Sequence, residues 1–186
     1  DRMVDGFLAA SDGKVDPSWV QVPVEMIRKD IRIEPMSSVT VNPGKLDATA
    51  VRELLIRARI DFKIVAGGNS QLQVKVNGQV LDESRIRNRL PRMDIGVNQI
   101  ATSIGGNIWF LFYAPDFKPI PESSGYAPRG IDPYELRFDI TDLWKPQGGN
   151  TIELADTSTV EQPIIAEVGL GTSLSPKLED PKVRPA

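Results

Sequence analysis

Apolar and polar residues alternate along several stretches of the chain, and the longest of these covers residues 54–65. Ile56, Ala58 and Ile60 fall on one side of an extended backbone, whereas the arginines between them fall on the other. A helix would scatter these apolar residues around its axis, so a period of two indicates a β-strand with one face in a core and one in solvent. The pattern therefore predicts a strand over residues 54–65.

The same alternation predicts further strands, and residues that favour turns separate them. Strands are expected at 26–33, 38–41, 72–76, 136–141, 151–154 and 164–168. The run 107–114 is apolar at nearly every position, which predicts a strand that is buried on both faces or has an apolar outer face. Turns are expected at 42–44, at 67–70, at the type I′ hairpin signal Asn77-Gly78, and at 148–150.

Little helix is expected. Asp142 can cap a single helical turn over 142–145, which Pro146 ends, and Asp47 can cap a second short helix within 46–53. Residues 115–133 are rich in proline, which predicts a long irregular loop.

Many short strands, little helix and abundant turn residues predict an all-β fold, a two-sheet antiparallel β-sandwich with long loops. The length of 186 residues fits one such domain. We expect the sandwich at 19–172, between an N-terminal extension at 1–18 and a C-terminal tail or linker at 173–186, where prolines and charges prevail.

The chemical inventory is narrow, because the chain has no cysteine and no histidine. This removes thiolate nucleophiles, zinc–thiolate sites and the commonest general base. No cofactor is expected, and a structural calcium ion is the metal that the remaining oxygen ligands favour. A net charge of −3 with scattered basic residues predicts no nucleic-acid partner. The chain also lacks an apolar run of about 18 residues, so no membrane span is expected.

Two hairpins, taken in order, resemble the galactose-binding-like jelly-roll domains of glycoside hydrolases and carbohydrate-binding modules. The resemblance is carried by Val76-Asn77-Gly78 and by FDITDL at 138–143, which leads through a Pro and Gly/Asn turn into NTIEL. Trp19 with Val20, Val22 and Pro23 matches the early part of the pattern more loosely. The similarity spans roughly residues 19–168 and implies a jelly-roll sandwich. The Arg- and Pro-rich insertion at 82–133 departs from the pattern, so no family sugar site maps onto individual residues.

Aromatic residues in and near the long loop form the candidate ligand-binding set. A sugar ring packs its C–H groups on aromatic faces, while flanking polar side chains bind its hydroxyls. The rings are those of Trp109, Tyr113 and Tyr126, and the polar candidates are Asn107, Asp116 and Arg129. The alternative for Trp109 and Tyr113 is a place in the core, or in an oligomer or interdomain surface formed by their strand.

The charged residues have ordinary interpretations. Arg85, Arg87 and Arg89 are spaced by two, which predicts one side of an extended strand, and Arg92 follows. Such a face is either solvated or a site for a polyanionic partner such as an acidic glycan. The acids of the clear strands, Asp139 among them, are expected to face solvent, which argues against catalysis. A glycosidase pair drawn from Asp116, Glu122 and Asp132 stays open.

These observations predict a non-catalytic carbohydrate-binding or accessory module of an exported, larger protein or complex, with a glycan or a neighbouring domain as its partner. The alternative is a structural subunit of a surface or multi-subunit assembly that uses the sandwich for protein–protein contacts. The chain begins with Asp1 rather than Met, which favours removal of a targeting segment or excision from a larger protein. We therefore expect an extracellular, periplasmic or cell-surface location.

Overall fold

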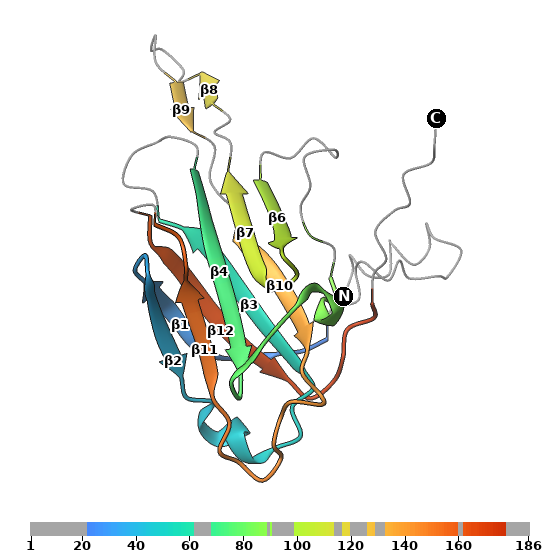
Figure 1. Ribbon diagram of the computed structural model, residues 1–186. Helices are drawn as coiled ribbons and strands as arrows, with labels where there is room; N and C mark the ends of the chain where they lie inside the picture. The colour runs from blue at the N-terminus through green and yellow to red at the C-terminus, as the bar shows by residue number, and fades with distance from the viewer. Residues whose placement is uncertain are drawn as a thin grey trace, which may run out of the picture.

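A computed structural model describes residues 22–61, 68–88, 90, 99–113, 117–119, 126–128, 133–159 and 162–177, and they form a sandwich of two antiparallel sheets (Figure 1). Sheet A has the order β1 (Glu25–Ile33), β12 (Ile164–Gly171), β3 (Glu53–Ile60) and β10 (Tyr134–Asp139). Sheet B has the order β2 (Ser37–Val41), β11 (Ile152–Asp156), β4 (Gly68–Val76), β7 (Ile108–Tyr113) and β6 (Gln99–Ile104), and β5 (Gln79–Val80) pairs with β4. The described residues contain no α-helix, only 3-10 helices at Gly44–Ala48 and Glu83–Arg85, so the predicted all-β sandwich is confirmed.

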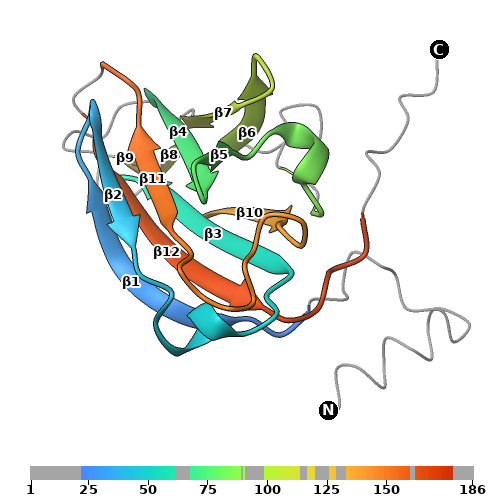
Figure 2. The same ribbon diagram turned by 60° about the horizontal axis from the view of Figure 1, so that its bottom comes forward.

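The strand pairs are nested along the chain. β1 pairs with β12, β2 with β11, β3 with β10 and β4 with β7, all antiparallel. Each pair encloses the next one in sequence, as if a long hairpin had been wrapped into two layers. Figure 2 shows these layers facing each other, with β1, β12 and β3 on one side and β2, β11 and β4 on the other. This order is compatible with a jelly roll.

The core lies between the two sheets and is built from alternate residues of each strand. Trp109 of sheet B and Phe138 of sheet A meet edge to face across the core, with ring centroids 5.4 Å apart. The Tyr134 hydroxyl donates to the carbonyl of Phe112, which links β10 to β7. The fully buried side chains from both inner faces include Ile31, Ile33, Leu54, Ile56, Ile60, Leu72, Val74, Leu136, Ile152, Leu154 and Ile164.

The edge of sheet A at β10 is closed by a short neighbouring segment. The Arg87 amide donates to the carbonyl of Arg137, and Ile86 forms a β-bridge with Phe138. The Asn88 side chain then imitates a strand residue, since it accepts from the Arg137 amide and donates to the carbonyl of Glu135. These contacts occupy backbone groups that an open edge would offer to another chain.

Asn150 cross-links the loops at one end of the sandwich. It is 5% exposed, and its amide oxygen accepts from the Lys145 amide and from Asn77 Nδ2. Its Nδ2 group donates to the Asp47 carboxylate and to backbone carbonyls. Asp47 in turn accepts from the amides of Gly149 and Asn150, so three loops distant in sequence share one network.

Most of the predicted strands are present. All six short strands and the strand within 107–114 are found, with ends that differ by a few residues, and β3 covers residues 54–60 of the predicted strand 54–65. The expected hairpin turn is confirmed by positive φ angles of 51° at Asn77 and 80° at Gly78. The glycine turn before Asn150 is also confirmed, with φ of 103° at Gly148 and 81° at Gly149.

Both predicted helices are wrong. Residues 141–143 form a turn that Asp139 caps by accepting from the amide and hydroxyl of Thr141, while Asp142 is exposed. The second predicted helix, within 46–53, does not form. Leu46 to Ala48 are the last residues of a 3-10 helix, and Glu53 begins β3. The Asp47 carboxylate accepts from a distant loop instead of capping a helix.

Two loop predictions also need correction. The turn expected at 67–70 is wrong from Gly68 onward, since β4 begins at that residue and pairs with β7. The loop at 115–133 is not wholly irregular, because β8 (Phe117–Pro119) and β9 (Tyr126–Pro128) pair as a separate two-stranded sheet. In both places backbone pairing outweighs the local preference of Gly and Pro for turns.

We expect Asn150→Ala to destabilise the domain by roughly 2–3 kcal/mol, because it leaves several buried backbone and side-chain groups without partners. Urea denaturation at neutral pH measures the change. Thr151→Ala is the matched control, since Thr151 has an exposed side chain and should stay within about 0.5 kcal/mol of the wild type. An Asn150 variant as stable as this control would show that the network contributes little.

Candidate functional site

The structure separates the residues that the sequence groups into one ligand-binding set. Trp109 has no exposed surface and its Nε1 donates to the Leu81 carbonyl at 3.3 Å, so its ring belongs to the core and is not offered to a ligand. Asn107 is exposed in the turn that precedes β7, whereas Tyr126 lies in β9, beyond the other end of β7 (Figure 1). These two residues are therefore not brought together.

The remaining members of that set are described in part or not at all. Tyr113 ends β7 and pairs with Gly68 and Gln99, but its side chain is outside the described part of the chain, as is that of Tyr126. Asp116 and Arg129 also lie outside the described residues.

The alternation along β7 exposes different rings from those that the sequence singles out. Because Trp109 and Leu111 point into the core, Ile108, Phe110 and Phe112 lie on the opposite side of the strand and are half-buried. The rings of Phe110 and Phe112 are nearly parallel, with an interplanar angle of 15° and centroids 6.2 Å apart.

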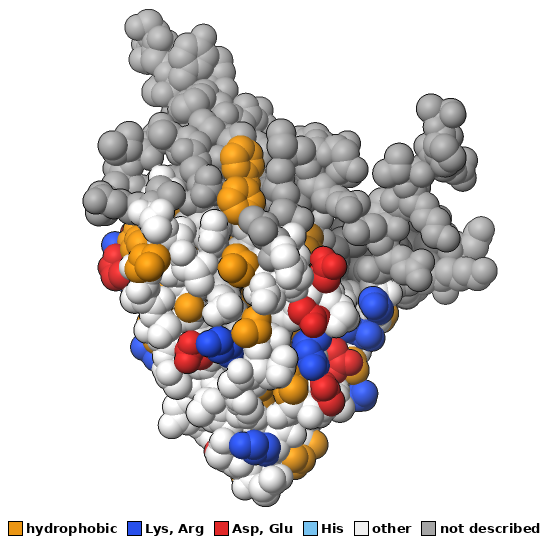
Figure 3. All heavy atoms as spheres, in the orientation of Figure 1, with side chains coloured by type: hydrophobic (Ala, Val, Ile, Leu, Met, Phe, Trp, Pro, Cys, Tyr) orange, Lys and Arg blue, Asp and Glu red, His pale blue; other side chains and the backbone are white. Residues whose placement is uncertain are grey.

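Polar side chains from the neighbouring strands share this surface, which we call the outer face of sheet B. Gln71 lies directly opposite Phe110, and Gln73 and Lys75 continue the row along β4. Lys75 stands opposite Glu153 of β11, with 3.9 Å between Nζ and Oε1. Figure 3 looks onto this face and shows hydrophobic side chains in a broken column among polar ones. The face combines apolar rings with amide groups and one balanced pair of charges.

The Gln71 side chain is held in place by a neighbour. Its Oε1 accepts from the Thr157 hydroxyl at 3.3 Å. The amide nitrogen is then directed away from Thr157. Beyond Thr157, at the β2–β11 edge, a hollow of about 320 Å³ is lined by Met36, Ser37, Ser38 and Ala155 among others.

Asp156, at the end of β11, is the one described acid whose pKa burial raises. It is 1% exposed, and its Oδ1 accepts from the amide and hydroxyl of Ser158. Its Oδ2 has no partner. Desolvation outweighs the two hydrogen bonds and raises the pKa of this carboxyl above its ordinary value of 3.8.

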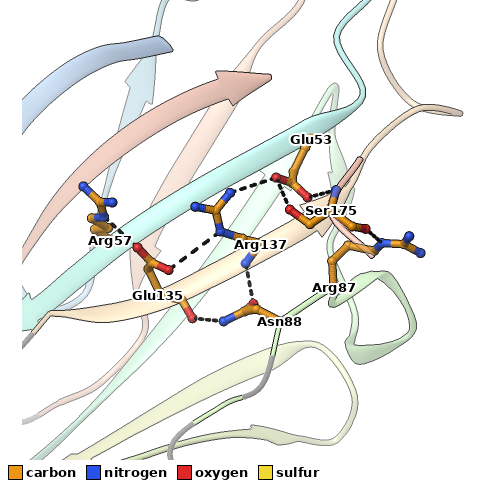
Figure 4. Close-up of polar contacts among 7 residues, drawn as sticks. All are labelled: Glu53, Arg57, Arg87, Asn88, Glu135, Arg137 and Ser175. Atoms are coloured by element: carbon orange, nitrogen blue, oxygen red, sulfur yellow. Dashed lines mark hydrogen bonds and ion pairs between the residues drawn. The ribbon is translucent and has the colours of Figure 1, made fainter. Parts of the chain in front are cut away.

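A second polar group lies on the opposite side of the sandwich, on the outer face of sheet A (Figure 4). Glu53 of β3 has no exposed surface and pairs with Arg137 of β10, which is 4% exposed, with 3.0 Å between Oε2 and Nη1. The Arg137 Nε also lies 3.7 Å from Glu135, and Glu135 accepts from Arg57 Nε at 2.9 Å.

The oxygens of Glu53 are shared with the chain that follows β12. Ser175 donates its amide to Oε1 and its hydroxyl to Oε2, both at 2.9 Å. Each oxygen of Glu53 therefore has a partner, and neither is left to act as a base or to bind a metal. The predicted strand 54–65 leaves Glu53 at the end of the helix expected within 46–53, so sequence reasoning misses this group, whose partner Ser175 lies far along the chain.

The predicted arginine face is not an extended strand. Arg85 lies in a 3-10 helix and forms two hydrogen bonds with the Asp142 carboxylate, which hold the pKa of Asp142 below its ordinary value. Arg87 donates from Nε to the Ser175 carbonyl at 2.8 Å. Arg89 and Arg92 lie outside the described residues. Two of the four arginines are thus engaged within the molecule, in different places.

Two further observations concern metals and membranes. The residues that the structure describes bring together no group of three acids that could hold a metal ion, and the calcium ion stays a prediction. In the same residues no helix has the length and apolar character needed to cross a bilayer.

A scan of protein-family models finds none that matches the chain, and searches of curated proteins and of solved structures return no significant match.

We expect Asp156→Asn to stabilise the domain at pH 7 but not at pH 3.5. The raised pKa means that ionised Asp156 costs stability, a cost that is absent below about pH 3.8, grows as the pH rises to the folded pKa, and is constant above it. Asparagine keeps the acceptor for Ser158 and removes the charge. Thermal melting at both pH values measures the difference.

Asp142→Asn serves as the control of opposite sign. The pKa of Asp142 is lowered by Arg85, so its ionised form adds stability that is lost as the pH falls through the folded pKa. This variant should be slightly less stable than the wild type at pH 7 and equal to it in acid. A melting curve for Asp156→Asn that shows the same shift at both pH values would contradict the desolvation argument.

Proposed function

We propose that this chain is a non-catalytic carbohydrate-binding module that binds its glycan on the outer face of sheet B. The observation that carries the proposal is the pair of parallel, half-buried rings, Phe110 and Phe112, beside Gln71 and Gln73 on the outer face of sheet B. The nested strand order supports the further proposal that the sandwich is a jelly roll of the galactose-binding-like kind.

The chemistry of this face suits a sugar. Aromatic rings pack against the C–H faces of a pyranose, and glutamine offers both a donor and an acceptor to its hydroxyls. Phe110 and Phe112 lie two residues apart on one strand with their rings stacked on each other, so together they offer a sugar one aromatic contact surface. Lys75 and Glu153 offset each other's charge, so we infer that the preferred glycan is neutral.

The competing function uses the same face for protein contacts. Ile108, Phe110 and Phe112 give it an apolar centre, as in the middle of a protein–protein interface. The glutamines favour the glycan, because their paired donors and acceptors match hydroxyl groups. A structural subunit should form a stable oligomer through these side chains, whereas a glycan-binding module should bind as a monomer.

The role as an accessory part of an exported, larger protein belongs to the same proposal. A module without its own chemistry acts by holding a partner near its substrate, which raises the effective concentration. An extracellular, periplasmic or cell-surface location is where such a module meets polysaccharide.

We expect the double variant Phe110→Ala/Phe112→Ala to lose neutral-glycan binding by about tenfold or more, since both aromatic rings are removed. A glycan array, with native mass spectrometry on the same sample, measures binding and oligomeric state together. Arg59→Ala, an exposed change on the other sheet, is the matched control and should bind as the wild type does. A silent array combined with a stable wild-type oligomer that the double variant dissociates would favour the structural subunit.

We also expect the purified chain to turn over no aryl glycoside. The proposal assigns no base or nucleophile, and the candidate acids Asp116, Glu122 and Asp132 lie outside the described residues. Release of the aryl alcohol, followed by absorbance, measures activity. Turnover that one alanine substitution among these three abolishes would overturn the non-catalytic assignment.

A further inference from the structure

Residues 172–177, which follow β12, carry a buried residue although they form no regular structure. Ser175 is 4% exposed, while its neighbours at 172, 173, 176 and 177 are exposed. An irregular terminal segment normally leaves its backbone groups to water. Burial of a single serine in such a segment points to a specific docking contact.

Three polar groups of Ser175 are bound from two sides. Glu53 of β3 takes both the amide and the hydroxyl, and Arg87, from the segment that closes β10, donates to the carbonyl at 2.8 Å (Figure 4). The start of the segment is fixed too, because the Arg52 amide donates to the Gly171 carbonyl at 2.9 Å. The contacts come from residues 87 and 53, which are distant in sequence from Ser175.

The charge of Glu53 makes this contact selective. A buried carboxylate needs partners for both of its oxygens, and Arg137 satisfies only one. If the segment left the sheet, Glu53 Oε1 would lose its protein donor. The docked serine therefore completes a set of hydrogen bonds that an apolar residue at position 53 would not require.

We propose that residues 172–177 form a strap, fixed by Glu53 and Arg87 as an integral part of the domain rather than as a flexible linker. The strap holds Ser175 on the side of sheet A. This holds whether or not the outer face of sheet B binds glycan, and it leaves that face uncovered. The tail predicted from Ser173 onward is thus bound to the domain at least through Ser175.

Hydrogen exchange and fluorescence test the strap in the full chain. The Ser175 amide should exchange far more slowly than an unstructured amide. The chain has no cysteine, so Lys177→Cys gives a unique site for a dye, whose anisotropy should report tumbling of the whole domain. In the double variant Glu53→Leu/Arg137→Leu, an apolar pair replaces the ions and the sandwich should still fold, as circular dichroism can verify. There we expect Ser175 protection to fall about ten- to a hundredfold, and the anisotropy to fall with it.

Two single variants keep the test decisive if the double variant does not fold. Ser175→Ala leaves the ion pair intact and should lower the protection of its own amide several-fold, because the hydroxyl no longer helps to hold the segment. Arg32→Ala removes an exposed ion pair elsewhere and should leave Ser175 unchanged. A wild-type Ser175 amide that exchanges at the unstructured rate would overturn the strap, as would full protection in a folded Glu53→Leu/Arg137→Leu protein.

Discussion

The register of β3 is the constraint on which the rest of the structure depends. This strand lies inside sheet A and pairs along its full length with β12 on one side and from Glu53 to Ala58 with β10 on the other. Its inner side chains, Leu54, Ile56 and Ala58, form part of the core, and its outer side chains include Glu53 and Arg57. A slip of one residue would exchange the two faces and bring Glu53 into the apolar core, which makes other registers costly.

The strands could be predicted from the sequence because their signal is local. Alternation in 54–60 predicts an extended backbone, and the pair Asn77-Gly78 predicts a hairpin turn, each from a few neighbouring residues. The structure confirms the strand and the turn. The prediction for Asp47 is wrong because its partners are distant in sequence. Asp47 suggests a helix cap when taken alone, but its hydrogen bonds go to Gly149 and Asn150, about a hundred positions later. Local propensity cannot include a partner that only the fold supplies.

The candidate site shows the same limit in a different form. Alternation within 107–114 requires that Trp109 and Phe110 point to opposite sides, but it does not say which side is the core. The sequence suggests Trp109 as a platform for a sugar ring. In the structure its side chain packs in the core against Phe138, and its indole nitrogen donates to the Leu81 carbonyl. The signal that would have identified the exposed rings is the pairing of β7 with β4, which sets Gln71 beside Phe110. The sequence of either strand alone does not predict which strand it pairs with.

The two outer faces have different relations to the rest of the chain. On sheet A, the charges of β3 and β10 pair with one another, and Ser175 meets the remaining need of Glu53, so much of that face is committed to internal contacts. On sheet B, Phe110 and Phe112 are only half-buried, and the Gln71 amide oxygen accepts from the Thr157 hydroxyl. Satisfied polar groups stabilise a fold but recognise nothing further, whereas half-exposed aromatic rings beside polar side chains favour a ligand. With the proposed strap on sheet A and the proposed glycan-binding face on sheet B, the two roles use separate surfaces of the sandwich.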